Sequence, residues 1–189
     1  LFAGQNVVQF SGANYSPHAF VPQEPYVDYI DEVIYFSDDP AIVNSFKRRY
    51  DDVWVTTTGY TPYANLSGTR TRNYALFDVD SQMNFPPFND FAIRSIGRYN
   101  AERESIDSIM FRITDRRHTD ALIAAMGRGV PMRLITDVGE YRDPTRLWNS
   151  WNIDRLYTAG AQVRFEAHLG SLHQKSTILH GQDMVIFGS

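Results

Sequence analysis

The second half of the sequence alternates short apolar segments of strand length with longer segments of helical periodicity, and this alternation restricts the possible folds most strongly. The expected helices are residues 119–126 and 148–158, and Trp148, Trp151 and Leu156 are the expected core residues of the second. The expected strands lie around these helices, at 108–114, 131–136, 162–165, 172–179 and 184–187. Strands and helices that alternate in this way predict an α/β fold with a mostly parallel sheet and helices on its faces.

The first half of the sequence has fewer regular elements. Strands are expected at 7–10 and 31–36, and a helix is expected to begin after Asp39, a residue type that caps helix N-termini, and to end at Tyr50. The segment that follows, 56–89, is rich in Thr, Gly, Asn, Pro and Tyr, so we expect a connector with little regular structure. A helix at 90–99 is expected to begin the second half.

Two segments at opposite ends of the chain resemble each other. Leu1–Gly12 and Ile178–Ser189 align without a gap and are identical at four positions, and in both a Gly-Gln turn precedes an apolar strand. Two unrelated hairpins with similar turns would explain this likeness. The alternative is a duplicated protein, of which this chain holds the end of the first repeat and most of the second.

The composition excludes several kinds of site. There is no cysteine, so disulfides, cysteine nucleophiles and cysteine zinc sites are excluded, and an exported protein is slightly favoured. The net charge of −4 argues against a broad basic surface for nucleic acid. No run of about 18 apolar residues is present, so the sequence predicts no transmembrane segment.

A histidine and a lysine occupy alternate positions of one expected strand. His173 and Lys175 should point to the same face, with Thr177 beyond them, because side chains alternate along a strand. An imidazole can attack phosphorus and an ammonium can hold a non-bridging oxygen, so the pair suits phosphoryl transfer. Gly188-Ser189, after the next strand, can add backbone amides and a hydroxyl to the same oxygens.

The wider pattern resembles the signature of the phospholipase D superfamily. It comprises His173-x-Lys175, an apolar strand, a turn, a second strand and Gly188-Ser189, and the preceding segment SIDSIMFRITDRRHTDALIAAMGRGVPMRLITDVGE looks like the strand–helix–strand of that family. Near the N-terminus, Phe10-Ser11-Gly12-Ala13-Asn14 resembles the close of the same motif. The resemblance implies a phospholipase D-like α-β-α sandwich with a mixed sheet and duplicated halves, the first of them incomplete here.

The resemblance also implies roles for particular residues. His173 would be one histidine of a catalytic pair, with the other supplied by the missing part of the first repeat. The expected phosphate ligands are Lys175, Gly188, Ser189, Asn14 and Ser11, and Glu32 would orient a histidine. The family's chemistry implies no metal and no cofactor.

Three features depart from the family pattern. His180 stands where the motif has an aspartate, five residues after the lysine, and Ala3 is at the matching position of the first segment. The spacing to Gly188 is one residue longer than usual. In the first segment Ser11-Gly12 stands where Gly-Ser is expected, which puts that hydroxyl ligand in doubt.

These features predict three regions and a function. Residues 1–58 would be the tail of the first repeat, 59–89 a connector and 90–189 the second repeat, truncated after its Gly-Ser. The expected activity is phosphodiester hydrolysis or phosphatidyl transfer through a phosphohistidine, with a phospholipid as the favoured substrate and no activity from this fragment alone. A non-catalytic scaffold of the same fold, or a nuclease of the superfamily, are the alternatives.

Three other polar residues carry two interpretations each. Asp115 and Asp137 end expected strands, where α/β sites gather, but both are equally suited to capping helices. His168 lies close before the His173 strand and could line the rim of a site or belong to an ordinary loop.

Overall fold

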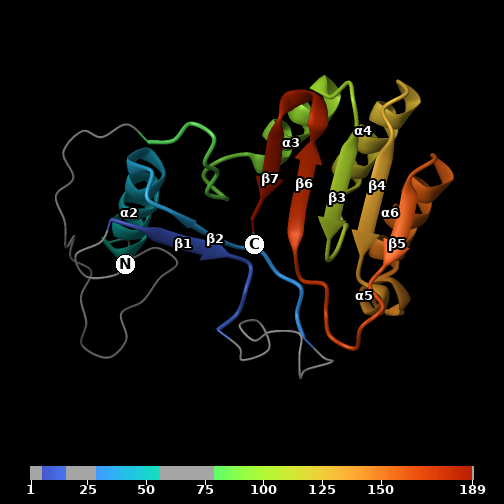
Figure 1. The fold of residues 1–189 in the computed structure, drawn as a ribbon, viewed down its shortest axis with the longest axis horizontal. Coiled ribbons are helices and arrows are strands. Elements are labelled where there is room, and N and C mark those ends of the chain that lie inside the picture. The colour runs from blue at the N-terminus through green and yellow to red at the C-terminus, as the bar shows by residue number, and fades with distance from the viewer. Residues whose placement is uncertain (1–5, 16–28, 56–78, 189) are drawn as a thin grey trace. The chain divides into compact units, whose positions relative to one another are not determined.

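The computed structural model describes residues 6–15, 29–55 and 79–188 (Figure 1). These residues fall into two compact units, which we describe separately. Residues 6–10, 35–55 and 79–90 form the first unit, and residues 11–15, 29–34 and 91–188 form the second. None of the helices within these ranges is long and apolar enough to cross a membrane.

The smaller unit contains a two-stranded sheet and one long helix. The strands are β1 (Val8–Ser11) and β2 (Ile34–Ser37), and the helix is α2 (Pro40–Val55). Asp39 caps α2 as predicted, because its Oδ1 accepts the backbone N–H groups of Ala41 and Ile42 at 2.8 and 3.1 Å. Residues 79–89 contain no helix or strand, in agreement with the expected connector, and the rest of it, 56–78, lies outside the described residues.

A five-stranded mixed sheet forms the centre of the larger unit. Its strands are β3 (Ile106–Met110), β4 (Met132–Thr136), β5 (Gln162–Phe165), β6 (Lys175–Leu179) and β7 (Met184–Phe187). They lie in the order β5-β4-β3-β6-β7. The pairs β3–β4 and β4–β5 are parallel, whereas β3–β6 and β6–β7 are antiparallel, so half of the pairings depart from the mostly parallel sheet. The predicted α/β class with a mixed sheet is confirmed.

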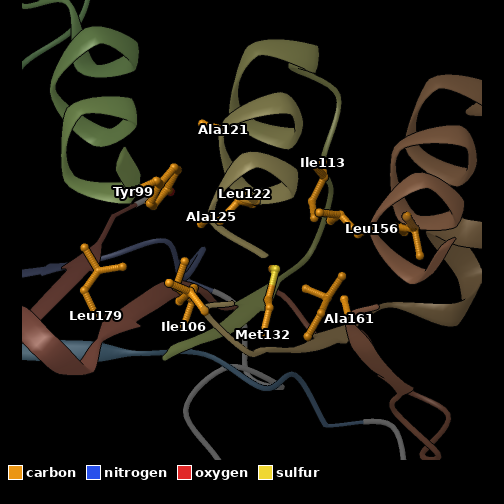
Figure 2. Packing of buried hydrophobic residues seen from close by; sticks show 13 residues of the cluster. Tyr99, Ile106, Ile113, Ala121, Leu122, Ala125, Met132, Leu156, Ala161 and Leu179 are labelled. Carbon is orange, nitrogen blue, oxygen red and sulfur yellow. The ribbon is translucent and has the colours of Figure 1, made fainter. Parts of the chain in front are cut away.

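Three helices lie behind this sheet in Figure 1: α3 (Phe91–Ala101), α4 (Arg116–Gly127) and α6 (Leu147–Thr158). The short helix α5 (Val138–Arg142) follows β4 directly. Apolar side chains from the helices and from one face of the sheet form the core, which Figure 2 shows between the two layers; they include Tyr99, Ile106, Leu122, Ala125, Met132, Leu156 and Leu179. Burial of this apolar surface is the main source of stability for the unit.

Three strands are clearly shorter than predicted, and the shortened ends of β3 and β6 lie next to each other in the sheet. β6 begins at Lys175, because Leu172 forms an isolated bridge with Asp31 and the His173 amide donates to the Asp31 carbonyl at 2.9 Å. β3 ends at Met110, although the next amide, that of Phe111, still donates to the Gln174 carbonyl at 3.1 Å. The predicted strand 31–36 likewise begins only at Ile34.

The predicted core positions of α6 were partly wrong. Leu156 is buried, but Trp148 and Trp151 are 65% and 40% exposed. Two asparagines take the buried face instead, and both bond to one residue: Asn149 Oδ1 accepts the Ile113 amide at 2.7 Å, and Asn152 Nδ2 donates to the Ile113 carbonyl at 3.2 Å. These bonds pair the backbone N–H and C=O of Ile113 in the loop that follows β3. Asparagines are therefore favoured over the larger tryptophans on the buried face of α6.

Candidate active site around His173 and Lys175

His173 and Lys175 lie together beside the carboxyl end of the central strand β3. Lys175 is the first residue of β6 and pairs with Met110, the last residue of β3. Its ammonium nitrogen lies 3.0 Å from His173 Nδ1 and also donates to the His173 carbonyl oxygen. The structure therefore brings the predicted histidine and lysine together, although His173 precedes the strand and does not lie within it.

A buried carboxylate fixes the imidazole of His173. Glu32 Oε2 lies 2.9 Å from His173 Nδ1, and the Glu32 side chain is only 3% exposed, against 29% for His173. The second carboxylate oxygen, Oε1, accepts the Val33 amide at 2.9 Å. The predicted orienting residue therefore contacts the predicted catalytic histidine.

This contact selects one tautomer of the ring. An ionised carboxylate can only accept hydrogen bonds, so Nδ1 must carry the proton that binds Glu32. Lys175 then directs its N–H groups to the His173 carbonyl oxygen and not to a lone pair on Nδ1. The assignment follows from the hydrogen-bond network, and it leaves the lone pair on Nε2 available for attack or for accepting a proton.

One aromatic ring packs against both groups. The Phe111 ring centroid lies 4.9 Å from that of the His173 imidazole at an interplanar angle of 53°. The Lys175 ammonium lies 5.1 Å from the same Phe111 centroid, and the Arg112 guanidinium carbon lies 5.2 Å from it. Cations over an aromatic face are attracted by its quadrupole, so Phe111 stabilises positive charge beside the imidazole.

The environment of Lys175 favours its neutral form more than water does. Burial is the largest cause that lowers the pKa of Lys175; the nearby Glu32 carboxylate raises it and the Arg112 guanidinium lowers it further. An added phosphate would reverse this balance, because a negative charge next to the ammonium favours the protonated form.

The segments beside Glu32 and His173 are held by a second set of contacts. His168 Nε2 lies 2.8 Å from Asp31 Oδ2, and the Tyr29 ring stacks on the His168 ring at 4.1 Å. Asp137 accepts the Leu172 amide at 3.1 Å with one oxygen, and with the other it accepts the Glu140 amide at 2.8 Å as the cap of α5. The helix-cap interpretation of Asp137 is therefore confirmed, and the residue also fixes the chain just before His173.

The remaining predicted ligands do not contact His173 and Lys175 through their side chains. The Ser11 hydroxyl accepts the Ala13 amide at 3.1 Å, and Asn14 is exposed. Within residues 6–15, 29–55 and 79–188, no hydrogen bond joins either of them to His173 or Lys175. The Gly188 amide donates to the Lys175 carbonyl at 3.2 Å, and Ser189 lies outside the described residues.

Sequence reasoning missed two members of the site, Phe111 and Arg112. Both were placed inside the predicted strand 108–114, where nothing distinguished them from other strand residues. The signal that could have found them is positional, since they directly follow a strand whose carboxyl end lies at the edge where α/β proteins bind ligands.

One family model matches part of the chain. Residues 98–189 match the model of a family described as cardiolipin synthase, PLD-like domain. No curated protein matches the chain significantly.

Three solved structures are similar to part of the chain. A phospholipase D family member, Nuc from Salmonella typhimurium, is 20% identical over 50% of this chain and 60% of its own, with a TM-score of 0.45. NucT from Helicobacter pylori is 19% identical over 47% and 59% of the two chains, with a TM-score of 0.38. A polyphosphate kinase from Porphyromonas gingivalis is 14% identical over 55% and 17%, with a TM-score of 0.39.

The chain therefore spans about three fifths of the length of the first two of these structures. The family match covers residues 98–189, which contain the five-stranded sheet, the helices α4 and α6, and both His173 and Lys175. Over residues 98–189 the chain is thus similar to a phospholipase D-like domain, which places this part of it with the phospholipase D superfamily.

Proposed function

We propose that the whole protein hydrolyses or transfers phosphodiesters through a phosphohistidine, with His173 as one of two catalytic histidines. The observation that carries this proposal is the contact of Glu32 with His173 Nδ1 at 2.9 Å. It leaves Nε2 as the reactive nitrogen and holds the ring in one orientation. Family membership supports a phosphodiesterase, and the details of the mechanism are our inference.

The reaction has two steps. In the first, one histidine forms an N–P bond as the P–O bond to the leaving alcohol breaks, and the second histidine gives that alcohol a proton. In the second, water or an acceptor alcohol gives its proton to the second histidine and attacks phosphorus, and the N–P bond breaks. His173 suits either role, because Glu32 stabilises the imidazolium that forms when Nε2 takes a proton.

Lys175 is proposed to bind the non-bridging phosphoryl oxygens as negative charge builds on them. Gly188 supports this role indirectly, because its amide is already bonded to the Lys175 carbonyl and fixes the position of the lysine. Ser189, Ser11 and Asn14 remain proposed phosphate ligands by resemblance to the family motif.

A phospholipid is the favoured substrate. The matching family is described as cardiolipin synthase, and the net charge of −4 disfavours a duplex nucleic acid, whose binding depends on neutralising phosphates. The non-catalytic alternative is favoured by one observation, that His180 replaces the motif aspartate. In the structure His180 bonds to Asp107 at 2.9 Å and belongs to the turn η1 (His180–Gln182).

The test uses the full-length protein and a chromogenic phosphodiester such as bis(4-nitrophenyl) phosphate. We expect His173→Ala to lower turnover by at least 10³-fold, because a lost nucleophile or proton donor removes a whole catalytic step. His180→Ala is the matched control, since this histidine also bonds to a carboxylate but lies in the turn. Equal turnover of wild type and H173A would remove His173 from the mechanism.

A further inference from the structure

A cavity of about 430 Å³ opens beside the carboxyl end of β3. Its walls come from the loop after β3, the start of α4 and the loop between α5 and α6. Three arginines line it, Arg112, Arg116 and Arg146, together with Trp148 and Asn149. The size suits a head group or another small ligand.

The three arginines keep their terminal donors available. Their acid contacts are made through Nε: Arg112 with Glu140 at 2.6 Å, Arg146 with the same carboxylate at 2.9 Å and with Asp143 at 3.2 Å, and Arg116 with Asp120 at 3.4 Å. In the part of the chain that the structure describes, their Nη atoms form no hydrogen bond. A guanidinium whose Nε is paired still offers four N–H donors in a planar fork, a geometry that suits phosphate oxygens.

One buried nitrogen at this cavity lacks a hydrogen-bond acceptor. Asn149 is fully buried and uses its Oδ1 for the Ile113 amide, but its Nδ2 has no partner among the described residues. The buried Nε of Arg146, in contrast, faces two carboxylates, those of Glu140 and Asp143. Buried donors without acceptors are rare in folded proteins, so the Asn149 amide indicates an acceptor that the described residues do not supply.

The cavity is connected to the candidate active site through Phe111. The Arg112 guanidinium in the cavity wall lies 5.2 Å from the Phe111 ring, and the same ring contacts His173 at 4.9 Å. Only the Phe111 side chain would therefore lie between a ligand bound to Arg112 and the imidazole of His173. The exposed Trp148 ring also lines the cavity. It offers an apolar surface for the uncharged part of a ligand that links two phosphate groups.

We propose that this cavity binds a second phosphate group of the substrate, while the phosphodiester to be cleaved lies at His173. This inference rests on the proposed function and narrows the substrate class to phosphodiesters that carry a further phosphate. A diphosphorylated lipid and a phosphorylated nucleotide chain share this chemistry. The two classes are distinguished below by comparing, within each class, substrates with one and with two phosphates.

The first experiment measures binding without catalysis. Full-length protein carrying His173→Ala is titrated with inorganic phosphate, and the fluorescence of Trp148 is followed. We expect a saturable change that Trp148→Phe abolishes and that Arg116→Gln weakens about tenfold in affinity, because one charge-assisted contact is lost. Arg116 is 68% exposed, so its replacement should not disturb folding.

Arg164→Gln is the matched control, since Arg164 is an exposed arginine on β5 outside the cavity. Arg146→Gln gives an independent second variant, which should weaken phosphate affinity to a similar extent. If both cavity variants bind phosphate as tightly as R164Q does, or if the W148F protein keeps the fluorescence change, the proposal is overturned.

The second experiment measures KM for substrates that differ by one phosphate. The nucleotide pair is pTpT and TpT, and the lipid pair is cardiolipin and phosphatidylglycerol in mixed micelles. For the pair that the enzyme uses, Arg116→Gln should raise KM of the two-phosphate substrate about tenfold relative to KM of its partner. An unchanged ratio would contradict the second phosphate site, whereas phosphate binding without any turnover would contradict only the proposed reaction.

Discussion

At the scale of residues, the reactivity of His173 depends on a carboxylate that is distant in sequence. Glu32 is 141 positions away, yet its Oε2 lies 2.9 Å from Nδ1 and its side chain is almost completely buried. A buried carboxylate is costly unless it is paired, so both partners favour the arrangement in which Nδ1 carries the proton. The same arrangement would stabilise the imidazolium of the proposed mechanism.

Replacing Glu32 with Gln tests this dependence. The amide has nearly the same shape but no charge, and its NH₂ group can bind the other tautomer of the ring. We expect kcat for bis(4-nitrophenyl) phosphate to fall by about 100-fold or more in the full-length protein, with a smaller effect on KM. Asp154→Asn is a suitable control, because it makes the same chemical change in an exposed residue that bonds Tyr141. A kcat for E32Q within threefold of that for D154N would mean that the carboxylate does not orient the histidine.

Sequence could identify the site residues whose side-chain chemistry forms a motif, but not those that long-range backbone pairing brings to the site. His173, Lys175 and Glu32 have chemistry that a motif can reveal, and the structure brings the three together. Phe111 directly follows the end of β3, and its ring lies beside His173 because its amide bonds to the Gln174 carbonyl of the partner segment. Such long-range backbone pairing is invisible to local periodicity.

At the scale of elements, the short helical turn between β6 and β7 is held by one buried glutamate. Glu102, at the end of α3, is fully buried and accepts the amides of Arg103, Glu104 and Gly181 at 3.0, 2.8 and 2.8 Å. Gln182 donates its side-chain amide to the other oxygen at 3.1 Å. The hairpin that carries Lys175 is thus anchored to the residue that follows α3, 79 positions before Gly181.

This anchor predicts a pH dependence of stability. Burial by itself would raise the pKa of Glu102, but the hydrogen bonds from Glu104, Gln182, Gly181 and Arg103 lower it to about 2. Since the folded-state value is below the unfolded one, the stabilisation is complete above the ordinary pKa of about 4.5 and is lost as pH falls towards 2. Glu102→Gln should lower the free energy of unfolding by about 2–3 kcal/mol at pH 7, and by less at pH 3. Urea unfolding at both pH values measures this, and an equal loss at the two would show that the charge is not involved.

Gly181 has no room for a side chain at this anchor. A Cβ atom there would lie 2.5 Å from Glu102 Oε1 and 3.3 Å from the Glu104 backbone nitrogen, so the turn must move to accept one. We expect Gly181→Ala to destabilise the protein by about 1–3 kcal/mol in thermal or urea unfolding. Gly97→Ala is the matched control, because Gly97 lies inside α3 with no atom near the added methyl group, and alanine there should stabilise the helix by up to about 1 kcal/mol. Similar stabilities of the two variants would contradict the close packing at the turn.

Most elements were predictable because their apolar spacing is local. β5 and β7 have the predicted bounds, α6 begins one residue early, and Asp115 caps α4 through the Arg117 amide. The orientation of α6 was not predictable, since Asn149 and Asn152 are buried to satisfy the backbone of Ile113. No pattern of hydrophobicity favours a buried asparagine over an exposed tryptophan.

At the scale of the whole molecule, one His-x-Lys pair raises the question of where the second histidine comes from. The described histidines outside the candidate site are each bonded to a neighbouring side chain: His118 to Ser95, His168 to Asp31 and His180 to Asp107. Each of them anchors a helix, loop or turn, so none is a convincing partner for His173. The proposed mechanism therefore needs a second histidine that is not among these described residues.

The expected result for residues 1–189 alone is no turnover of bis(4-nitrophenyl) phosphate as a monomer, because the leaving alcohol would lack its proton donor. Light scattering gives the oligomeric state of the same sample, and the full-length protein serves as the positive control. If the fragment were active only as a dimer, its specific activity would fall on dilution, and mixing with H173A chains would show that two copies share a site. Activity that stays constant per chain down to fully monomeric concentrations would mean that a single imidazole suffices, and the two-histidine mechanism would then be wrong.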